Sequence, residues 1–183
     1  MVKVAILMAT GCEEIEALTV VDLLRRAKIS IDMISVDSAP TVTGAHGIIV
    51  EADVPMRDAD WSKYEALILP GGMPGTLNLK NNEAVTTQVK QFYNAGKLVA
   101  AICAAPTVLG HCGILEGKRA TCYPGCEDGL TGAVLATDNV VRDGNIITSR
   151  GMGTAIDFGL ALIANLLDQP TADELAKSIV YRA

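Results

Sequence analysis

The sequence contains neither a long apolar run nor a run of basic residues. No segment approaches the roughly 18 consecutive apolar residues that a membrane-spanning helix needs. The apolar stretch at residues 4–9 is shorter than the core of a secretory signal, and no cleavage site follows it. A formal net charge of −6 disfavours binding to nucleic acids or anionic membranes. We therefore expect a cytoplasmic protein without nucleic-acid or membrane partners.

Cysteines are few and irregularly spaced. Five of them, an odd number, do not form a disulfide framework, and we expect reduced thiols. Cys122 and Cys126 flank a short turn but have no further ligand cluster, so they do not predict a zinc site. The sequence also lacks the Gly-x-x-x-x-Gly-Lys-Ser/Thr motif of P-loop kinases and ATPases. We expect neither a metal nor a cofactor.

Aromatic residues make up only 4% of the chain, whereas half of the residues are hydrophobic. Such an aliphatic core is typical of a parallel sheet buried on both faces. Short apolar runs alternate with longer amphipathic runs, which predicts one α/β domain over residues 1–183 with helices on both faces of a mostly parallel sheet. The predicted strands are 2–8, 30–36, 66–69, 98–102, 119–122, 140–142 and 146–149, with a hairpin at 41–51; the predicted helices are 13–27, 82–94, 104–110, 154–167 and 171–180.

The strongest motif is the segment 98–106, LVAAICAAP, which runs from a strand into a helix with Cys103 at the junction. Small neighbours suit a tight elbow, and Pro106 suits a first helical turn. A thiol facing the positive end of a helix has its pKa lowered from about 8.5 to roughly 3.5–7.5. Backbone amides at the same turn can bind an oxyanion. The alternative is a buried structural cysteine, which behaves as a small apolar residue.

Three carboxylates follow the first predicted strand: Glu13, Glu14 and Glu16. Any of them complements the dipole of a helix that begins there. Glu13 and Glu16 are three residues apart and border the apolar stripe of this helix, whereas Glu14 lies toward its other side. A glutamate facing apolar walls has a raised pKa and can hold a proton for a neighbouring thiolate. Helical phase does not choose between Glu13 and Glu16.

Two glycine-rich loops also follow strands. In residues 69–75, LPGGMPG, consecutive glycines let backbone amides approach a ligand, although an ordinary tight turn explains them equally well. Residues 148–154, TSRGMGT, contain Gly-x-Gly, but Ile156 occupies the third small position and the motif lies late in the chain, which argues against a dinucleotide site. Arg150, in this second loop, is suited either to bind a carboxylate or to tie loops together, and we favour the second role.

Neither of the two histidines forms an obvious pair with Cys103. His111 lies about two turns along the predicted helix and points away from the thiol, and His46 is expected at the surface of the hairpin. A catalytic Cys–His pair therefore lacks a member.

Four motifs together resemble the ThiJ/PfpI superfamily in order and spacing, over essentially the whole chain. They are EEIE at 13–16, LPGG at 69–72, AAICAAP at 100–106 and TSRGMGT at 148–154. The resemblance points to the branch of Parkinsonism-associated deglycase and YajL-like proteins. It implies a flavodoxin-like fold, similar to that of class I glutamine amidotransferases, and a homodimer.

The resemblance also implies roles for individual residues. Cys103 matches a nucleophile that is readily oxidised to the sulfinic acid, and Glu16 matches the protonated glutamate beside it. The amides of Gly72 and Ala104 match the oxyanion site, and Arg26 matches a basic residue near the partner's site.

Two positions depart from the family pattern. Tyr123 stands where many members carry histidine, which leaves Glu16 as the principal proton shuttle. Met152 stands where proline is usual, which alters the pocket wall or the dimer seam. Together with Arg26 and Arg150, these residues are candidates for site-wall or dimer contacts.

The resemblance implies a glutathione-independent glyoxalase, a lyase of glyoxalase III type, or a protein deglycase, a hydrolase. Its substrates would be small dicarbonyls or early glycation adducts formed in oxidative and carbonyl stress. The alternative is a redox-responsive chaperone or stress sensor in which Cys103 is oxidised without turnover. A third candidate, a cysteine peptidase or amidohydrolase, lacks the histidine beside the cysteine.

Overall fold

The structure is a computed structural model in which residues 2–182 are described. Its centre is a seven-stranded sheet in the order β10-β11-β7-β6-β1-β2-β5. Neighbouring strands are parallel except for β10 and β11, which are antiparallel. The strands of this sheet are β1 (Lys3–Met8), β2 (Ser30–Ser35), β5 (Val54–Pro55), β6 (Ala66–Leu69), β7 (Leu98–Ile102), β10 (Val140–Asp143) and β11 (Ile146–Ser149).

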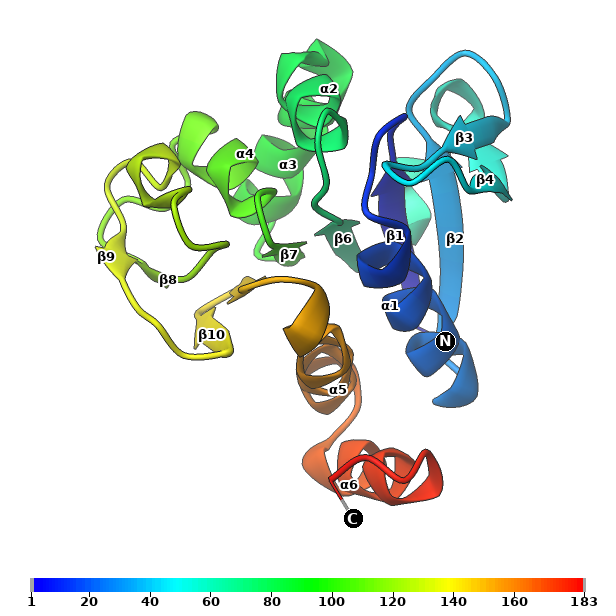
Figure 1. Ribbon diagram of the computed structural model, residues 1–183, viewed down its shortest axis with the longest axis vertical. Helices are drawn as coiled ribbons and strands as arrows, with labels where there is room; N and C mark the ends of the chain where they lie inside the picture. The colour runs from blue at the N-terminus through cyan, green and yellow to red at the C-terminus, as the bar shows by residue number, and fades with distance from the viewer. Residues whose placement is uncertain (1, 183) are drawn as a thin grey trace.

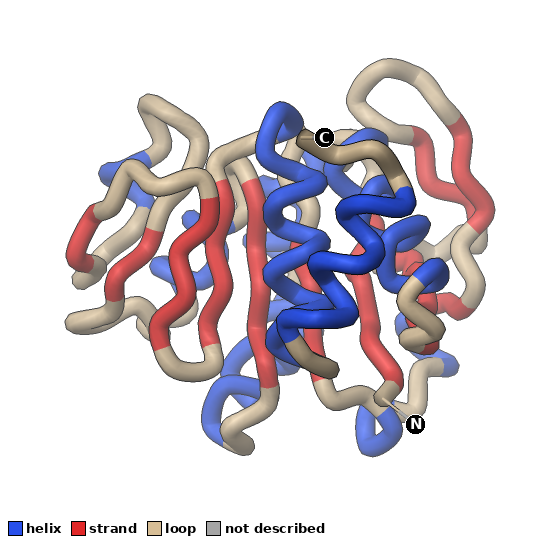
Figure 2. Tube along the Cα trace, turned by 90° about the horizontal axis from the view of Figure 1, so that it is seen from below, coloured by secondary structure: helices blue, strands red, loops and turns tan. Residues whose placement is uncertain are grey.

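Helices cover both faces of the sheet, which confirms the predicted α/β, flavodoxin-like architecture. Figure 1 shows α2, α3 and α4 on one side and α5 and α6 on the other, and α1 packs with α5. Figure 2 shows strands side by side behind helices of one face. The helices are α1 (Glu14–Arg26), α2 (Gly75–Asn81), α3 (Glu83–Asn94), α4 (Pro106–His111), α5 (Ala155–Leu166) and α6 (Gln169–Ser178), with short 3-10 turns η1 (Met56–Asp58), η2 (Trp61–Lys63), η3 (Glu127–Gly129) and η4 (Met152–Thr154).

Alternation along the strands divides the core into two layers. In β1, Val4 and Ile6 pack in the layer of α1 and α5, whereas Ala5 and Leu7 pack in the layer of α3 and α4. Successive strand side chains point to opposite faces, so an uninterrupted apolar run is what a doubly covered strand requires. All four side chains are fully buried. Burying a large aliphatic side chain contributes about 1.5–3 kcal/mol, so the run itself specifies a central strand.

Two small sheets lie outside the main one. The predicted hairpin is present as the antiparallel pair β3 (Thr41–Thr43) and β4 (Ile49–Glu51). The segment between β7 and β10 forms a parallel pair, β8 (Arg119–Ala120) and β9 (Val134–Leu135). Among the described residues, no helix has the length and apolar character needed to cross a membrane.

The structure differs from the predicted elements mainly where they are short. The helix α2 was not predicted, because it follows a proline- and glycine-rich loop and no side chain caps its first turn. The two-residue strands β5 and β9 were also missed, since so few residues display no periodicity. The helix after Cys103 begins at Pro106 rather than at residue 104, because Ala104 and Ala105 form the turn that leads into it.

Strand order explains how distant loops come together. The strands β1, β6, β7 and β11 are successive parallel neighbours. Their carboxyl ends therefore lie at one edge of the sheet, which is where ligands bind in such folds. The four sequence motifs lie at or shortly after these carboxyl ends, each in the segment that joins a strand to the following helix.

Candidate active site

Cys103 lies immediately after β7 in a backbone conformation that is uncommon for a side-chain-bearing residue, with φ +65°. Its N–H donates a hydrogen bond to the carbonyl oxygen of Ser149 (3.0 Å), and its own carbonyl oxygen accepts one from the N–H of Tyr123 (2.8 Å). These bonds hold the turn from both sides. The thiol is half-buried and lies within hydrogen-bonding reach of the backbone amides of Gly72 and Ala104.

Glu16 is the carboxylate that meets this thiol. It lies in the first turn of α1, is 1% exposed, and its Oε2 accepts a hydrogen bond from the N–H of Gly71 (2.9 Å). Its side chain also hydrogen-bonds to Cys103. Glu13 stands outside the helix as the N-cap and accepts from the N–H of Ile15 (3.3 Å). The structure thus resolves the choice that helical phase left open.

The glycines after β6 permit the close approach of Cys103 and Glu16. A Cβ on Gly71 would lie 2.6 Å from both the Cβ of Cys103 and Oε2 of Glu16. Gly72 adopts φ +90° and packs against the backbone of Glu13, so a side chain there would be strained and would collide. This loop is therefore more than an ordinary tight turn, because its two glycines leave room for the thiol, the carboxyl group and an exposed amide.

Burial determines the ionisation of the pair. It raises the pKa of Glu16 to about 7, although hydrogen bonds with Cys103 and Gly71 act in the opposite direction. Burial, the charge of Glu16 and the hydrogen bond with Glu16 together raise the pKa of the Cys103 thiol to about 12. The amides of Ala104 and Gly72 lower the pKa of Cys103, but by less.

The predicted lowering of the Cys103 pKa is therefore wrong. The expected helix begins three residues after Cys103 and has only six residues, and a buried carboxylate adjoins the sulfur. The thiol keeps its proton while Glu16 is ionised. Because the thiol hydrogen-bonds to Glu16 and its pKa lies above that of the carboxyl group, Glu16 is placed to accept the thiol proton during a reaction.

Tyr123 and Gly151 form a wall beside the sulfur. A Cβ on Gly151 would lie 3.3 Å from the Tyr123 ring and 3.9 Å from Sγ of Cys103, so both the ring and the sulfur lie close to this glycine. The Tyr123 side chain is half-exposed, as is that of Met152 in η4. Arg150 donates from Nη1 to the carbonyl oxygen of Thr137 (3.1 Å) and ties two loops together, as expected.

Arg26 lies at the other end of α1 from Glu16. Ten residues of α-helix span about 15 Å, so Arg26 does not reach the thiol of its own chain. Its Nε forms an ion pair with Oδ2 of Asp22 (2.5 Å) at the surface. The structure therefore brings together Cys103, Glu16, Gly72 and Ala104, with Tyr123 at the wall, and leaves Arg26 outside.

Sequence reasoning missed the role of Glu14. This residue is 2% exposed, and its Oε1 accepts hydrogen bonds from the N–H groups of His46 (2.8 Å) and Ile48 (3.4 Å). Its Oε2 lies 2.9 Å from Nδ1 of His46. Burial raises the pKa of Glu14, but the hydrogen bonds from His46 and Ile48 outweigh burial and lower that pKa to about 2. Glu14 thereby fixes the β3–β4 hairpin to the first turn of α1.

Among the described residues, Glu13, Glu14 and His46 offer ligand atoms within 4.8 Å of one another. Both oxygens of Glu14 already bind His46 or Ile48. The hydrogen bond to Glu14 and the charges of Glu13 and Glu14 raise the pKa of the His46 imidazole. The cluster therefore clamps the hairpin to the first turn of α1 through contacts between His46 and the two carboxyl groups.

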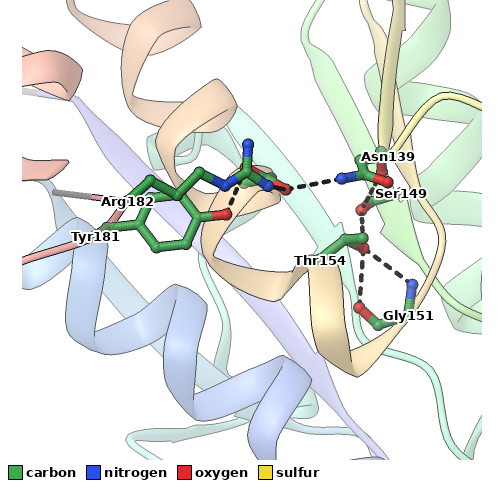
Figure 3. A network of polar contacts seen from close by, with 7 residues as sticks. Asn139, Ser149, Gly151, Thr154, Tyr181 and Arg182 are labelled. Carbon is green, nitrogen blue, oxygen red and sulfur yellow. Dashed lines mark hydrogen bonds and ion pairs between the residues drawn. The ribbon is translucent and has the colours of Figure 1, made fainter.

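A chain of polar contacts supports the wall at Gly151 (Figure 3). Oγ1 of Thr154 accepts from the N–H of Gly151 (3.1 Å) and lies 2.9 Å from its carbonyl oxygen. The fully buried Ser149 contacts Thr154 Oγ1 (2.7 Å) and donates to the carbonyl oxygen of Asn139 (2.7 Å). Because the carbonyl group of Ser149 also binds the N–H of Cys103, the same segment positions both the wall and the nucleophile.

The network extends to Tyr181 and Arg182, the last two residues that the structure describes. The side chain of Asn139 donates to Oδ2 of Asp157 (3.1 Å), and Asp157 also accepts from the hydroxyl of Tyr181 (2.7 Å) and the guanidinium of Arg182 (2.9 Å). Figure 3 shows Tyr181 and Arg182 on the opposite side of α5 from Gly151.

Comparisons of the sequence with known proteins identify relatives from one family over nearly the whole chain. Residues 2–165 match the DJ-1/PfpI family. The protein DJ-1 homolog B of Arabidopsis thaliana is 40% identical over 182 residues, 98% of this chain and 42% of that protein. The protein dj-1beta of Drosophila melanogaster is 33% identical over 177 residues, 96% of this chain and 95% of that protein. The chain spans less than half the length of the Arabidopsis relatives that it matches.

Solved structures of related proteins have the same fold. The oxidized DJ-1 of Toxoplasma gondii superposes with a TM-score of 0.96 at 35% identity, covering 100% of both chains. A mutant of a DJ-1 superfamily protein from Salmonella typhimurium superposes with a TM-score of 0.95 at 37% identity, covering 99% of both chains.

Proposed function

Because the chain belongs to the DJ-1/PfpI family, we propose that it is a cysteine-dependent enzyme acting on reactive dicarbonyls or early glycation adducts. The observation that carries this proposal is the pair of half-buried Cys103 and buried Glu16 beside the amides of Gly72 and Ala104. The pair supplies a nucleophile and a proton acceptor, and the amides are placed to bind an oxyanion. The chemistry needs no glutathione, since the thiol belongs to the protein.

The first step is addition of the thiol to an aldehyde. Sγ of Cys103 forms a bond to the carbonyl carbon, and the electron pair of the C=O bond moves to oxygen, where the two amides stabilise it. The thiol proton passes to the carboxylate of Glu16, which then protonates the oxyanion to give a hemithioacetal. A carboxyl group with a pKa of about 7 is suited both to accept the thiol proton and to donate it to the oxyanion near neutral pH.

With methylglyoxal, the hemithioacetal proceeds to lactate without an external oxidant. Glu16 removes the proton from the former aldehyde carbon and an enediol forms, which takes a proton on the neighbouring carbon and becomes a thioester. Water hydrolyses the thioester, releases lactate and restores the thiol. One carbon is oxidised as its neighbour is reduced, and the net change is addition of one water molecule. An early glycation adduct would enter through the same addition at its carbonyl group.

We also propose a homodimer as the working form. Ile15 and Leu18 are exposed on α1, and Ile48 and Ile49 are exposed on the hairpin that packs against its first turn. Large apolar side chains on neighbouring elements favour association with a second copy. In such a dimer Arg26, remote from its own thiol, would contribute near the partner's site. The five free thiols are in keeping with a reducing cytoplasm.

A second candidate function is redox sensing through Cys103. The similar Toxoplasma gondii DJ-1 has been solved in an oxidized form, and Cys103 is partly exposed beside a proton acceptor. Sulfur would attack one peroxide oxygen and release water, giving a sulfenic acid, and a second peroxide would give the sulfinic acid. This function requires no turnover of a carbonyl substrate.

Methylglyoxal consumption separates the two functions. We expect the wild-type protein to convert methylglyoxal to lactate, Cys103→Ser to abolish the conversion, and Glu16→Gln to slow it at least tenfold. Cys112→Ser, which alters a thiol outside the site, is the matched control and should retain wild-type turnover. Equal consumption by the wild type and Cys103→Ser would refute the enzyme, whereas selective addition of two oxygens at Cys103 by dilute peroxide would support the sensor.

A further inference from the structure

A cavity of about 260 Å³ lies next to the candidate site, on the side of α2 and α4. Ala104, one of the two amide donors, lines it, and so does Met73, which follows the other donor, Gly72. The cavity therefore lies beside the two segments that carry these amides, while Cys103 and Gly72 themselves are outside its lining. Nothing in the addition step described above occupies it.

One wall of this cavity carries a buried hydroxyl group without a partner. Thr76 is 2% exposed, and its Oγ1 makes no hydrogen bond within the described residues. A buried polar group that is left unpaired destabilises the folded protein. The hydroxyl has almost no accessible surface, so a ligand in the cavity would form this hydrogen bond after rotation of the Thr76 side chain toward it.

The remaining lining defines the chemistry of the occupant. Met73, Leu77 and Ala104 present apolar groups. The charged residues among the lining are Lys80 and Asp128, one of each sign, so no net charge selects a cationic or anionic group. The cavity suits an uncharged, apolar group that carries one hydrogen-bonding atom.

We propose that this cavity is a subsite for the uncharged apolar arm of a carbonyl compound that reacts at Cys103, with Thr76 hydrogen-bonding to a polar atom of that arm. The inference rests on the proposed function only in naming the substrates, 2-oxoaldehydes with an aryl or branched alkyl arm. The subsite itself is independent of turnover, because an electrophile that reacts at Cys103 without being a substrate can place its arm in the same cavity.

Alkylation of Cys103 tests the subsite directly. N-Benzyl iodoacetamide carries an amide and an apolar arm, whereas iodoacetamide lacks the arm. In both reactions a C–S bond forms, iodide leaves, and the thiol proton passes through Glu16 to solvent. The rate with N-benzyl iodoacetamide is divided by the rate with iodoacetamide, both measured at pH 8 by mass spectrometry of the Cys103 peptide. This ratio should exceed the same ratio for free cysteine at least tenfold.

Variants in the cavity wall should change this ratio. Leu77→Trp fills the cavity and should reduce the ratio about tenfold, to that of free cysteine. Thr76→Val removes the hydroxyl group and should reduce it several-fold, whereas Thr76→Ser should restore it. Leu167→Trp, at a similarly exposed leucine outside the cavity, is the matched control and should keep the wild-type ratio.

The outcomes distinguish this inference from the enzyme itself. A wild-type ratio equal to that of free cysteine, or a ratio unchanged by both Leu77→Trp and Thr76→Val, overturns the subsite. If the protein consumes neither methylglyoxal nor phenylglyoxal, the proposed function fails, and the alkylation ratio still decides the subsite. If both stand, Leu77→Trp should lower kcat/KM for phenylglyoxal far more than for methylglyoxal.

Discussion

Replacing Glu16 by glutamine should stabilise the protein at alkaline pH, although it removes the proton acceptor of Cys103. Burial raises the pKa of this carboxyl group from 4.5 to about 7. In the unfolded chain the pKa returns to its ordinary value. One pKa unit corresponds to about 1.36 kcal/mol, so ionising Glu16 in the folded protein costs about 3 kcal/mol. Glutamine avoids this cost, and its amide oxygen can still accept the hydrogen bond from Gly71.

The sign of the pH dependence follows from the direction of the shift. Below pH 4.5 the Glu16 carboxyl group is protonated in both states, and its burial contributes no pH-linked destabilisation. As the pH rises from 4.5 through 7, the unfolded chain ionises first and stability is lost. The free energy of unfolding of Glu16→Gln, relative to wild type, should therefore increase by about 2–3 kcal/mol between pH 5 and pH 8.

Urea unfolding followed by circular dichroism at these two pH values measures the effect. A matched control is Glu14→Gln, two residues away on the same helix. The pKa of Glu14 is lowered, so its ionised form is favoured in the folded protein and glutamine should destabilise it at neutral pH. If the difference between Glu16→Gln and wild type were the same at pH 5 and pH 8, the carboxyl group would not have the raised pKa on which the proposed proton transfer depends.

Two further substitutions test the wall and the dimer. Thr154→Val removes the hydroxyl group that holds Gly151. It should lower kcat/KM for methylglyoxal about tenfold, as expected for a lost buried hydrogen bond of about 1–3 kcal/mol. Thr154→Ser keeps a hydroxyl group and should stay within twofold of the wild-type kcat/KM, and equal rates for both variants would exclude a positioning role. Ile49→Glu places a charge on the exposed hairpin and should convert the dimer to monomer in light scattering, whereas a Val180→Glu control at the other end of the chain should remain dimeric. A monomeric wild type would contradict the proposed interface.

The sequence predicted the order of strands and helices well, because that order follows from hydrophobic periodicity. Apolar runs such as 66–69 and 98–102 coincide with β6 and β7, since a strand buried on both faces has no polar positions. Elements without periodicity were missed. The helix α2 lies in a segment whose prolines and glycines predict a loop, and it persists because it packs against α3 and α4.

The candidate site was only partly predictable, for a geometric reason. Glu13 and Glu16 border the same stripe, and the decision between them depends on where α1 begins. Glu13 has extended backbone angles, with φ −75° and ψ 113°, so it caps the helix instead of joining it. Glu14 was misjudged for a similar reason. Its partner His46 comes from a hairpin whose docking on α1 leaves no periodic pattern in the sequence.

Two energetically unfavourable features coincide at the candidate site, and this supports a functional interpretation over a structural one. A left-handed backbone at a residue with a side chain costs about 1–3 kcal/mol, and the buried carboxylate of Glu16 costs about 3 kcal/mol once ionised. Domains are stable by only about 5–15 kcal/mol in total. Glycine at position 103 would remove the cost of the left-handed backbone. Glutamine at position 16 would remove the cost of the buried charge. A structural cysteine needs neither feature. A thiol that passes its proton to a buried base when it reacts needs both the left-handed turn that presents the sulfur and the carboxyl group of Glu16 beside it.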